Sequence, residues 1–541
     1  MKKLTDGDKM PQDTGKNRRV SMLRQGTSLS VLTLVSRVLG LLREMTKANF
    51  LGTSALSDAF SVAFMLPNLF RRLFAEGSIA VAFIPTFKEY LLKNDKEKNR
   101  EFLSCIFTFL TFFVTLAVMA GVLAAPLIIR FFGLEEVDEA ILLTRIMFPF
   151  LGFISLAALF QGILNSLHIF TPSAIAPILL NAVTILCAYA LSPFTGNPAR
   201  AMAAGIIIGG FLEAAIQLPF VIKNGQRFFF TGLKKAISNP GTRTVLRLIG
   251  PTIIGMAAYQ LNDIVSTALA GNAGVGVVSS LQYSLRLQEL ILGVFAVSIG
   301  TVLLPNLAEH AKLSHWETYN DQLISAMNII ALITIPITFF SLSQGDLMIR
   351  LLFQSRNRSF DENSVALTLS AFTFHMPGLF FIALNRILAP AFYAQSDAKS
   401  PTLAGIISFA VNMVLAIILV KPLRGAGIAL ALSAASAVNT AVLLAFLRKN
   451  PNIAVSRALR SALLYTLKLL VLSGIAVIPL LLLSPQLAGI FSGRGRFLSY
   501  GIPLAINLLI FSTLGILLLF VTRDKQLGAL IRAIKRNKQV M

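Results

Sequence analysis

Charged residues and cysteines are scarce in this sequence. Only 13% of its 541 residues are charged, about half the share of a typical soluble domain, whereas 55% are hydrophobic. The two cysteines, Cys105 and Cys187, both lie within apolar runs, so we expect neither a disulfide scaffold nor a cysteine-based metal site. This composition excludes a soluble globular enzyme and a disordered tail protein.

Recognised catalytic motifs are also missing. The four histidines are scattered, and the sequence has no Walker loop, no H-E-x-x-H motif and no dinucleotide-binding fingerprint. The loops are too short for a nucleotide-binding domain, so we expect no cofactor and a process driven by the membrane potential or an ion gradient. The alternative of a membrane-embedded glycosyltransferase or polymerase requires a positioned carboxylate base, for which the outer loops offer no clear candidate.

Long apolar runs dominate what is present. Mean hydropathy is +0.73, and runs of about 20 residues recur, the length that crosses a bilayer as a helix. We predict an all-α polytopic membrane protein. Its fourteen expected spans cover residues 28–49, 59–87, 102–123, 146–164, 174–191, 201–221, 248–270, 277–304, 323–342, 365–391, 403–420, 428–446, 463–483 and 498–521.

The basic residues alternate along the chain. If the fourteen spans are correct, the tails and loops on one side hold 30 Lys and Arg residues and those on the other side hold ten, counting Arg145 at the edge of the fourth span. Cytoplasmic loops retain positive charge, so both termini are expected in the cytoplasm and the chain in the inner (cytoplasmic) membrane. The net charge of +23 is spread over these loops and forms no single patch, so no nucleic-acid partner is expected.

An internal repeat suggests two lobes. Residues 82–90 resemble residues 302–310 at an offset of about 220 residues, a feature of transporter architecture. The linker sequence around Phe228–Phe230 fits either an amphipathic segment in the cytoplasmic interface or an ordinary linker. We expect a cytoplasmic polar tail (1–27), a six-helix lobe (28–222), a cytoplasmic amphipathic linker (223–247), a second six-helix lobe (248–447), two further helices (448–522) and a basic cytoplasmic tail (523–541).

Ionisable residues within the spans are concentrated in three helices. Such residues are costly in lipid and are functional candidates by default. The first span carries Arg37, Arg43, Glu44 and Lys47, the second carries Arg71, Arg72 and Glu76 and is preceded by Asp58, and the eighth carries Arg286 and Glu289. The set has an excess of two positive charges, which a pyrophosphate would meet, because guanidinium groups bind phosphate bidentately. The alternative is that these residues pair with one another.

Two motifs carry a resemblance to a known family. They are Ser36-Arg-Val-Leu-Gly-Leu-Leu-Arg-Glu44 and the segment from Ser57-Asp-Ala-Phe to Phe-Ala-Glu-Gly77. Together with Gln282-Tyr-Ser-Leu-Arg286 and Gly300-Thr-Val-Leu-Leu-Pro305, they resemble the MurJ (MviN) lipid II flippases of bacteria. The resemblance implies the fold of the multidrug/oligosaccharidyl-lipid/polysaccharide (MOP) exporters. It further implies transfer of lipid II to the outer leaflet by alternating access, and a groove for the undecaprenyl tail between the last two helices.

The resemblance also suggests roles for the charged residues. Those matching the family's essential charged positions are Arg37, Arg43, Asp58, Arg71, Glu76 and Arg286. We expect Arg37, Arg43, Arg71, Arg72 and Arg286 to bind the substrate, and Glu44, Asp58, Glu76 and Glu289 to form gating ion pairs. The expected partners are lipid II and membrane lipids, with cell-wall synthesis complexes as further candidates.

The sequence departs from the family pattern at several positions. Met65 stands where many relatives carry a lysine, and Leu285 where relatives often have an aspartate. At the family's sodium site the aligned residues are Ser266 and Ala416. Asn412 is retained, and Asp263 is a candidate for a displaced ligand, so both are weak sodium candidates.

Two other transporter classes were weighed. A flippase for another polyprenyl-pyrophosphate-linked glycan, of the O-antigen or teichoic-acid type, would share the phosphate site and differ in its sugar and peptide contacts. A cation-coupled drug antiporter is the second alternative, although an arginine-rich cavity has the wrong sign for its substrates.

Overall fold

The computed structural model describes residues 15–72, 82–354 and 359–528, and within these ranges it contains helices and no strands. In chain order the helices are α1 (Gly15–Leu51), α2 (Ala55–Arg71), α3 (Ile84–Leu92), α4 (Lys96–Arg130), α5 (Val137–Met147), α6 (Phe150–Ser166), α7 (Thr171–Thr195), α8 (Pro198–Lys223), α9 (Leu233–Ser238), α10 (Pro240–Gly271), α11 (Val277–Lys312), α12 (Trp316–Phe353), α13 (Glu362–His375), α14 (Gly378–Tyr393), α15 (Lys399–Leu447), α16 (Val455–Phe491), the π-helix η3 (Phe497–Gly501) and α17 (Ile502–Val521). Glu76 lies outside the described residues.

The described helices account for thirteen of the fourteen expected spans; the second, 59–87, includes residues outside the described ranges, with α2 before them and α3 after them. The pairs α5–α6 and α13–α14 each form one bent span; the second pair bends by 46°. Helix α15 holds two spans, because the chain turns back around Pro422 and Arg424, whose φ of 49° is non-helical. Its arms run antiparallel, since Ser408 donates a hydrogen bond to the carbonyl oxygen of Ala435. The prediction of an all-α polytopic membrane protein is confirmed.

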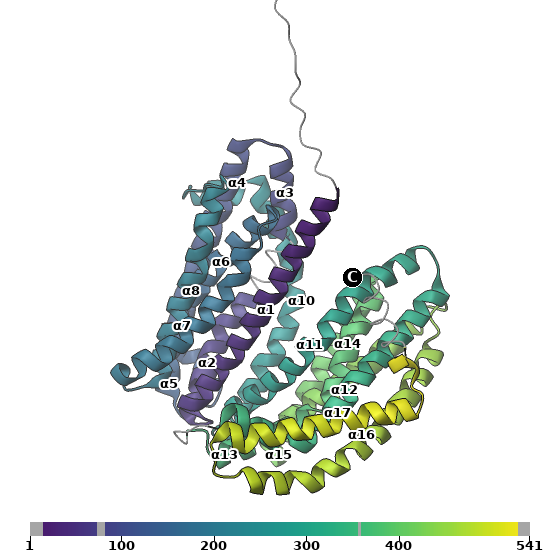
Figure 1. Cartoon of the computed structure of the whole chain (residues 1–541). Coiled ribbons are helices and arrows are strands. Elements are labelled where there is room, and N and C mark those ends of the chain that lie inside the picture. Colours follow the sequence, from purple (N-terminus) through teal and green to yellow (C-terminus); the bar gives the residue numbers. More distant parts are fainter. Residues whose placement is uncertain (1–14, 73–81, 355–358, 529–541) are drawn as a thin grey trace, which may run out of the picture.

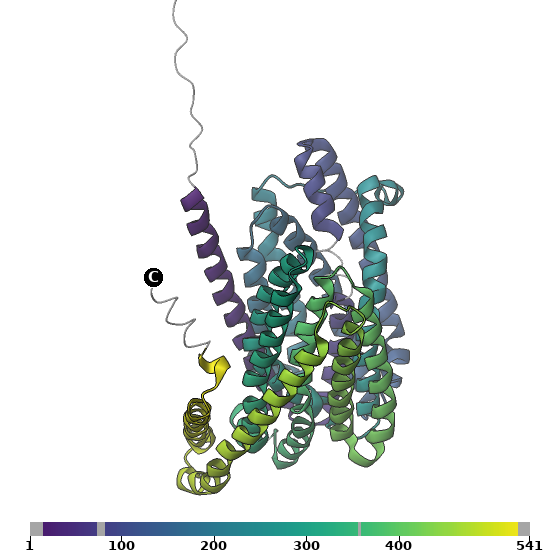
Figure 2. The same cartoon turned by 90° about the vertical axis from the view of Figure 1, so that its right-hand side faces the viewer.

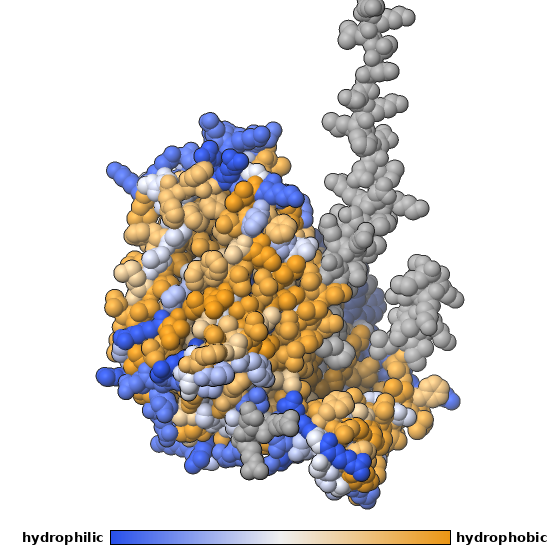
Figure 3. All heavy atoms as spheres, turned by 60° about the vertical axis from the view of Figure 1, so that its left-hand side comes forward, coloured by the Kyte–Doolittle hydropathy of each residue, from blue (hydrophilic) through white to orange (hydrophobic). Residues whose placement is uncertain are grey.

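The outer surface of the molecule suits a lipid environment. In Figure 3 a broad hydrophobic band lies between hydrophilic ends. Helix α4 illustrates it, because Leu116, Leu123 and Leu127 are all more than half exposed. Among the described residues, eight helices are long and apolar enough to cross a membrane, and the bent pair α13–α14 makes a ninth.

The helices form two lobes that meet at one end. Figure 1 shows the helices from α1 to α8 on one side and those from α10 to α15 on the other, approaching each other near α2 and α13 and diverging toward α3 and α4. We call the first end the seam and the opposite end, which carries the linker between α8 and α10, the linker end. At the seam Tyr283 donates a 3.0 Å hydrogen bond to the carbonyl oxygen of Gly52, and the hydroxyls of Thr53 and Ser364 lie 2.8 Å apart.

Two glycines allow this close approach. Gly52 has a φ of +56°, and a Cβ atom there would lie 1.8 Å from the carbonyl oxygen of Ser359. Gly276 has a φ of +80°, and its Cβ would lie 2.4 Å from the carbonyl oxygen of Thr53. Only glycine adopts these conformations without strain and leaves room for the facing backbone. The seam is therefore closed by backbone packing between the lobes.

The last two spans, α16 and α17, lie against the second lobe as a hairpin (Figure 2). A buried polar cluster attaches α17. The Asn507 side-chain amide donates to Gln344 Oε1 on α12 at 2.7 Å and to Ser484 Oγ on α16 at 2.8 Å. Just after α17, buried Asp524 accepts a 2.6 Å hydrogen bond from Lys468 on α16. Polar contacts thus fix both halves of the hairpin.

We expect Asn507→Ala to loosen α17. Interhelical hydrogen bonds in membranes contribute about 0.6–2 kcal/mol, so losing this one should lower the melting temperature by a few degrees. Leu509→Ala is the matched control, because Leu509 lies on the same helix with 68% of its side chain exposed. Thermal unfolding of the purified protein measures both variants; equal melting temperatures would show that the polar cluster does not attach α17.

Candidate functional site

A polar cavity lies between the two lobes. It has a volume of about 330 Å³ and is lined mainly by α1, α2, α10 and α11, with single turns of α13 and α15. These four helices carry the polar and ionisable residues that line the cavity, apart from His375 on α13. Their polar residues are therefore explained by position, because they face this central cavity rather than lipid.

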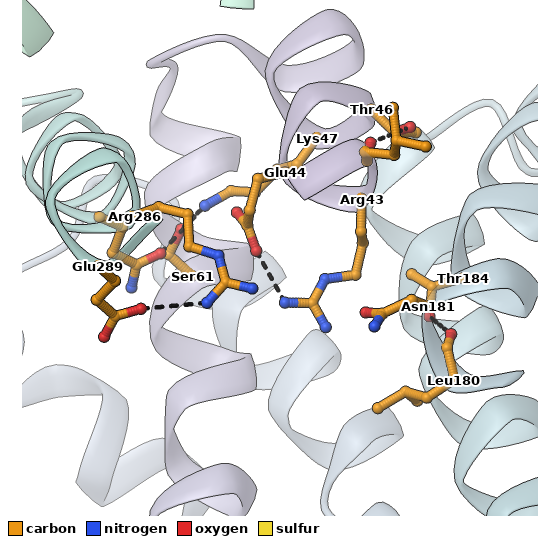
Figure 4. Close-up of polar contacts among 12 residues, drawn as sticks. Arg43, Glu44, Thr46, Lys47, Ser61, Leu180, Asn181, Thr184, Arg286 and Glu289 are labelled. Atoms are coloured by element: carbon orange, nitrogen blue, oxygen red, sulfur yellow. Dashed lines mark hydrogen bonds and ion pairs between the residues drawn. The ribbon is translucent and has the colours of Figure 1, made fainter. Parts of the chain in front are cut away.

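Three arginines enter the central cavity from different helices, and each has a carboxylate partner. Arg43 on α1 contacts Glu44 at 2.8 Å, Arg72 on α2 contacts Asp263 on α10 at 3.4 Å, and Arg286 on α11 contacts Glu289 at 3.1 Å. In Figure 4 the guanidinium groups of Arg43 and Arg286 point toward one another. Three of the five arginines that we expected to bind the substrate thus meet in one cavity, from both lobes.

A glycine on α1 makes room for one of these arginines. A Cβ atom on Gly40 would lie 2.7 Å from Nη2 of Arg286. The guanidinium of Arg286 therefore rests against the backbone of α1, although it comes from the other lobe. Gly40 belongs to the first of the two sequence motifs. This contact explains why a residue without a side chain suits that position.

The net charge of the central cavity differs from the excess of two positive charges that the sequence suggested. Apart from His375, the ionisable residues among the described lining of the central cavity are three arginines and three carboxylates, so the lining is close to neutral. Asp263, which the sequence count left out, supplies the third carboxylate. The alternative that charged residues pair with one another is confirmed for Arg43 with Glu44 and for Arg286 with Glu289. An incoming anion must therefore compete with these carboxylates for the guanidinium groups.

Two other predicted substrate-binding arginines lie elsewhere. Arg71 lines a separate cavity of about 240 Å³ inside the first lobe, together with Glu213 and Gln217. Arg71 therefore lines a different cavity from its neighbour Arg72, and successive residues of a helix point about 100° apart. Arg37 is exposed on α1, about two helical turns from Glu44 and toward the linker end.

Lys47 is a buried cation beside the central cavity that the sequence-based roles omitted. Only 3% of it is exposed, and its ammonium donates to Ser61 on α2 and, at 3.1 Å, to Gln282 on α11. It also lies 4.9 Å from the centre of the Tyr283 ring. Lys47 thus joins the two lobes through neutral side chains, which carry no charge signal in the sequence.

A second unpredicted contact involves His375. Its Nδ1 lies 2.6 Å from the hydroxyl of Ser284, and its carbonyl oxygen accepts from the Gln288 amide. All three residues are buried, and His375 reaches the cavity wall. This cluster packs α13 against α11 within the second lobe.

Asp58 occupies the seam rather than the cavity. Its carboxylate accepts hydrogen bonds from the backbone amides of Gly276 at 2.7 Å and Ser279 at 2.8 Å. These amides form the first turn of α11, where an acidic side chain satisfies unpaired donors and the helix dipole. Asp58 belongs to α2, so this cap spans the two lobes. The predicted gating by Asp58 through ion pairs stays a prediction, and its partner in this structure is a helix end.

The sodium candidates do not come together. Asp263 pairs with Arg72, whereas the Asn412 amide donates to Asn262 at 2.6 Å and to Ser266 at 3.3 Å. Within the described ranges no group of three His, Cys, Asp or Glu residues is placed to hold a metal ion. The two candidates thus have different partners, and no transport step is derived through a sodium ion.

Comparison with known proteins agrees with this architecture. A family model described as "Lipid II flippase MurJ" matches residues 47–492. A curated probable lipid II flippase MurJ of Treponema pallidum is 45% identical, over 95% of this chain and 98% of its own length. A probable lipid II flippase MurJ of Vibrio cholerae is 32% identical, over 78% of this chain and 82% of its own length.

Solved structures share the fold. An inward closed conformation of the lipid II flippase MurJ superposes with a TM-score of 0.75 and 26% identity, covering 92% of this chain and 99% of that one. An inward-facing multidrug transporter of the MOP superfamily matches with a TM-score of 0.66 and 13% identity, which shows the fold alone. With a family model that spans most of the sequence and close relatives matched along nearly their whole length, this multi-pass bacterial membrane protein belongs to the lipid II flippase MurJ family.

Proposed function

We propose that this chain is a lipid II flippase. It moves the undecaprenyl-pyrophosphate-linked peptidoglycan precursor from the cytoplasmic to the outer leaflet, as a secondary-type transporter rather than an enzyme. The observation that carries the proposal is the meeting of Arg43, Arg72 and Arg286 in one membrane-embedded cavity of a chain of this family. Guanidinium groups from both lobes suit an elongated diphosphate that bridges them.

The proposed orientation places both termini in the cytoplasm of the cell and the chain in its inner membrane. The excess of Lys and Arg in the tails and in the linker supports this orientation. The linker end is then cytoplasmic, and the seam faces the outer side. With the seam closed by Gly52, Gly276 and Asp58, the structure corresponds to a state closed toward the outside.

The proposed binding step is an exchange of ion-pair partners. The pyrophosphate oxygens replace Glu44 on Arg43 and Glu289 on Arg286, so the carboxylates hold the guanidinium groups in place until the substrate arrives. Arg37 lies on the same side of α1 as Glu44, about 10 Å nearer the linker end, and offers an earlier phosphate contact on the way in. A diphosphate bound by α1 and α11 at once draws the two lobes together at the linker end.

The release step is proposed to open the seam. When the lobes close at the linker end, α2 and α11 separate at the other end, and Asp58 leaves the first turn of α11. After release, each arginine pairs with its carboxylate again and the cavity lining is close to neutral. This favours the return of the protein to the state with the seam closed. The membrane potential or an ion gradient is proposed to drive the cycle, with no cofactor.

The polyprenyl tail is proposed to stay in lipid along the α16–α17 hairpin. Leu463, Val471 and Leu482 on α16 and Leu509 and Phe520 on α17 are all more than half exposed. A hydrocarbon chain can follow this surface at little cost, because it exchanges one apolar neighbour for another.

An accessibility assay tests the proposed function. In cells depleted of this protein, an added enzyme that cleaves only outward-facing lipid II should release less than a tenth of the product seen in undepleted cells. Total lipid II, measured in extracts, is the control and should stay equal or rise. Unchanged cleavage together with the loss of another surface glycan would contradict the lipid II assignment and favour a flippase for that other polyprenyl-linked glycan.

A further inference from the structure

The linker between the lobes runs along helix α4 and contacts it. We call residues 224–239 the strap. The Gln226 side chain accepts a 2.9 Å hydrogen bond from Asn99, and the backbone amides of Phe229 and Thr231 donate to Ser104 and Thr108, each at 3.0 Å. The contacts advance along α4 from residue 99 to residue 108, about 13 Å at 1.5 Å per residue. The strap therefore dips from the linker end into the apolar part of the lobe.

The strap then returns to its starting level through α9. Lys235 forms a 2.8 Å ion pair with Glu101, and its carbonyl oxygen lies 3.9 Å from Sγ of Cys105. Its deepest part is thus near Thr231, and both of its ends lie beside the first turns of α4. With this shape, the deepest part of the strap can enter the interfacial layer of a membrane while its ends stay at the surface.

The deepest part of the strap presents aromatic rings outward. Phe228 packs inward, with ring centroids 4.6 Å from Phe107 and 5.7 Å from Phe160. Phe229 and Phe230 are 53% and 70% exposed. Exposed rings at this depth meet the upper part of the acyl chains.

Three cations belong to chain segments at the level of residues 99–101 of α4. Arg100 places its guanidinium 4.4 Å from the centre of the Phe229 ring. Arg227 follows Gln226, which is bonded to Asn99, and Lys234 precedes Lys235, which is bonded to Glu101, so the backbone of each exposed cation is held beside the same turn of α4 as Arg100. The facing carboxylate of Glu101 is already paired with Lys235, and Glu97 lies one turn earlier on α4. The surface keeps a positive excess directly above an apolar patch.

We propose that the strap binds the phosphate headgroup of an anionic phospholipid of the cytoplasmic leaflet, between Arg100, Arg227 and Lys234, with its acyl chains against Phe229 and Phe230. The arrangement of cations above aromatic rings matches the order of phosphate and hydrocarbon in a leaflet. Its assignment to the cytoplasmic leaflet rests on the proposed orientation. Because the strap is the segment that joins the lobes, a bound lipid holds the linker on α4, and the second lobe moves about the start of α10.

Fluorescence quenching in nanodiscs tests this proposal on the full chain. Trp316 is the single tryptophan, so Trp316→Phe with Phe230→Trp gives one reporter. At equal total composition, brominated phosphatidylglycerol should quench it at least twofold more than brominated phosphatidylcholine. Changing Arg100, Arg227 and Lys234 to Gln should abolish the difference, whereas changing Arg448, Lys449 and Arg460 to Gln, a basic loop at the same end, should preserve it.

The outcomes separate the proposal from its competitors. Equal quenching by the two lipids in the unchanged strap would overturn the headgroup site, and no quenching by either would show that the strap lies outside the membrane. Loss of the preference on adding inorganic phosphate would assign the cations to a soluble anion instead. Phe229→Trp provides a second reporter if the first variant does not fold. None of these measurements requires transport, so failure of the proposed flippase function would leave their result unaffected.

Discussion

Arg286→Ala is expected to reduce lipid II export at least tenfold. Arg286 comes from the second lobe, faces Arg43 across the cavity and rests against Gly40 of the first lobe (Figure 4). A charge-assisted hydrogen bond contributes about 1.5–3 kcal/mol, so losing even one phosphate contact should cost about a factor of ten or more. The change also leaves Glu289 without its cation beside an anionic substrate, which adds repulsion. The measurement is the cleavage of outward-facing lipid II in cells that carry only the variant.

Two further variants make this result specific. Arg286→Lys keeps the charge but cannot bind two phosphate oxygens with one planar group, so we expect partial activity between the alanine variant and the unchanged chain. Arg457→Ala removes the same group at an exposed position, where Arg457 pairs with Asp321, and should leave export unchanged. If Arg286→Ala exports as well as Arg457→Ala, the central cavity is not the phosphate site.

Asp58→Asn is expected to open the seam. The carboxylate accepts two backbone hydrogen bonds from the first turn of α11. An asparagine has the same shape but only one acceptor oxygen, so its NH₂ group would face one of the two backbone N–H groups and could not accept from it. A loss of about 2 kcal/mol would shift the equilibrium between closed and open seam about 30-fold toward opening. The variant should therefore spend less time in the state with the seam closed and should export lipid II poorly.

Cross-linking reports this shift directly. The hydroxyls of Thr53 and Ser364 lie 2.8 Å apart across the seam, so cysteines at these two positions, in a chain without Cys105 and Cys187, should form a disulfide readily. Asp58→Asn should slow this reaction several-fold. Asp95→Asn is the matched control, because Asp95 caps α4 by accepting from Glu97 and Lys98 within one lobe. Equal cross-linking rates in the two variants would show that the Asp58 cap does not hold the seam.

The contrast between Arg71 and Arg72 shows where sequence reasoning about the site reached its limit. Both residues were visible as charges within a span, and both were expected to bind the substrate. The helix rotates about 100° between them, so Arg72 meets Asp263 in the central cavity while Arg71 lines a different one. Which of the two faces the other lobe depends on the rotation of α2, and that rotation is set by packing against α5 and α6.

Asp58 and Asp263 make the same point for acidic residues. An aspartate before a span suggested an ion pair with a nearby arginine, yet Asp58 caps a helix from the other half of the chain, 218 residues away. Asp263 was considered as a metal ligand and is instead a partner of Arg72. Neither contact has a local sequence signal, because both join residues from different lobes.

The sequence by itself determined the number of spans, their helical form and the helices that carry buried charge. These properties follow from the length of apolar runs and from the cost of placing an ion in lipid, which act on each segment separately. Only the tertiary structure decided that three arginines share the central cavity, that each already has a carboxylate partner, and that Asp58 closes the seam on α11. These features depend on the relative rotation and spacing of helices from two lobes, which arise from packing and not from any one segment.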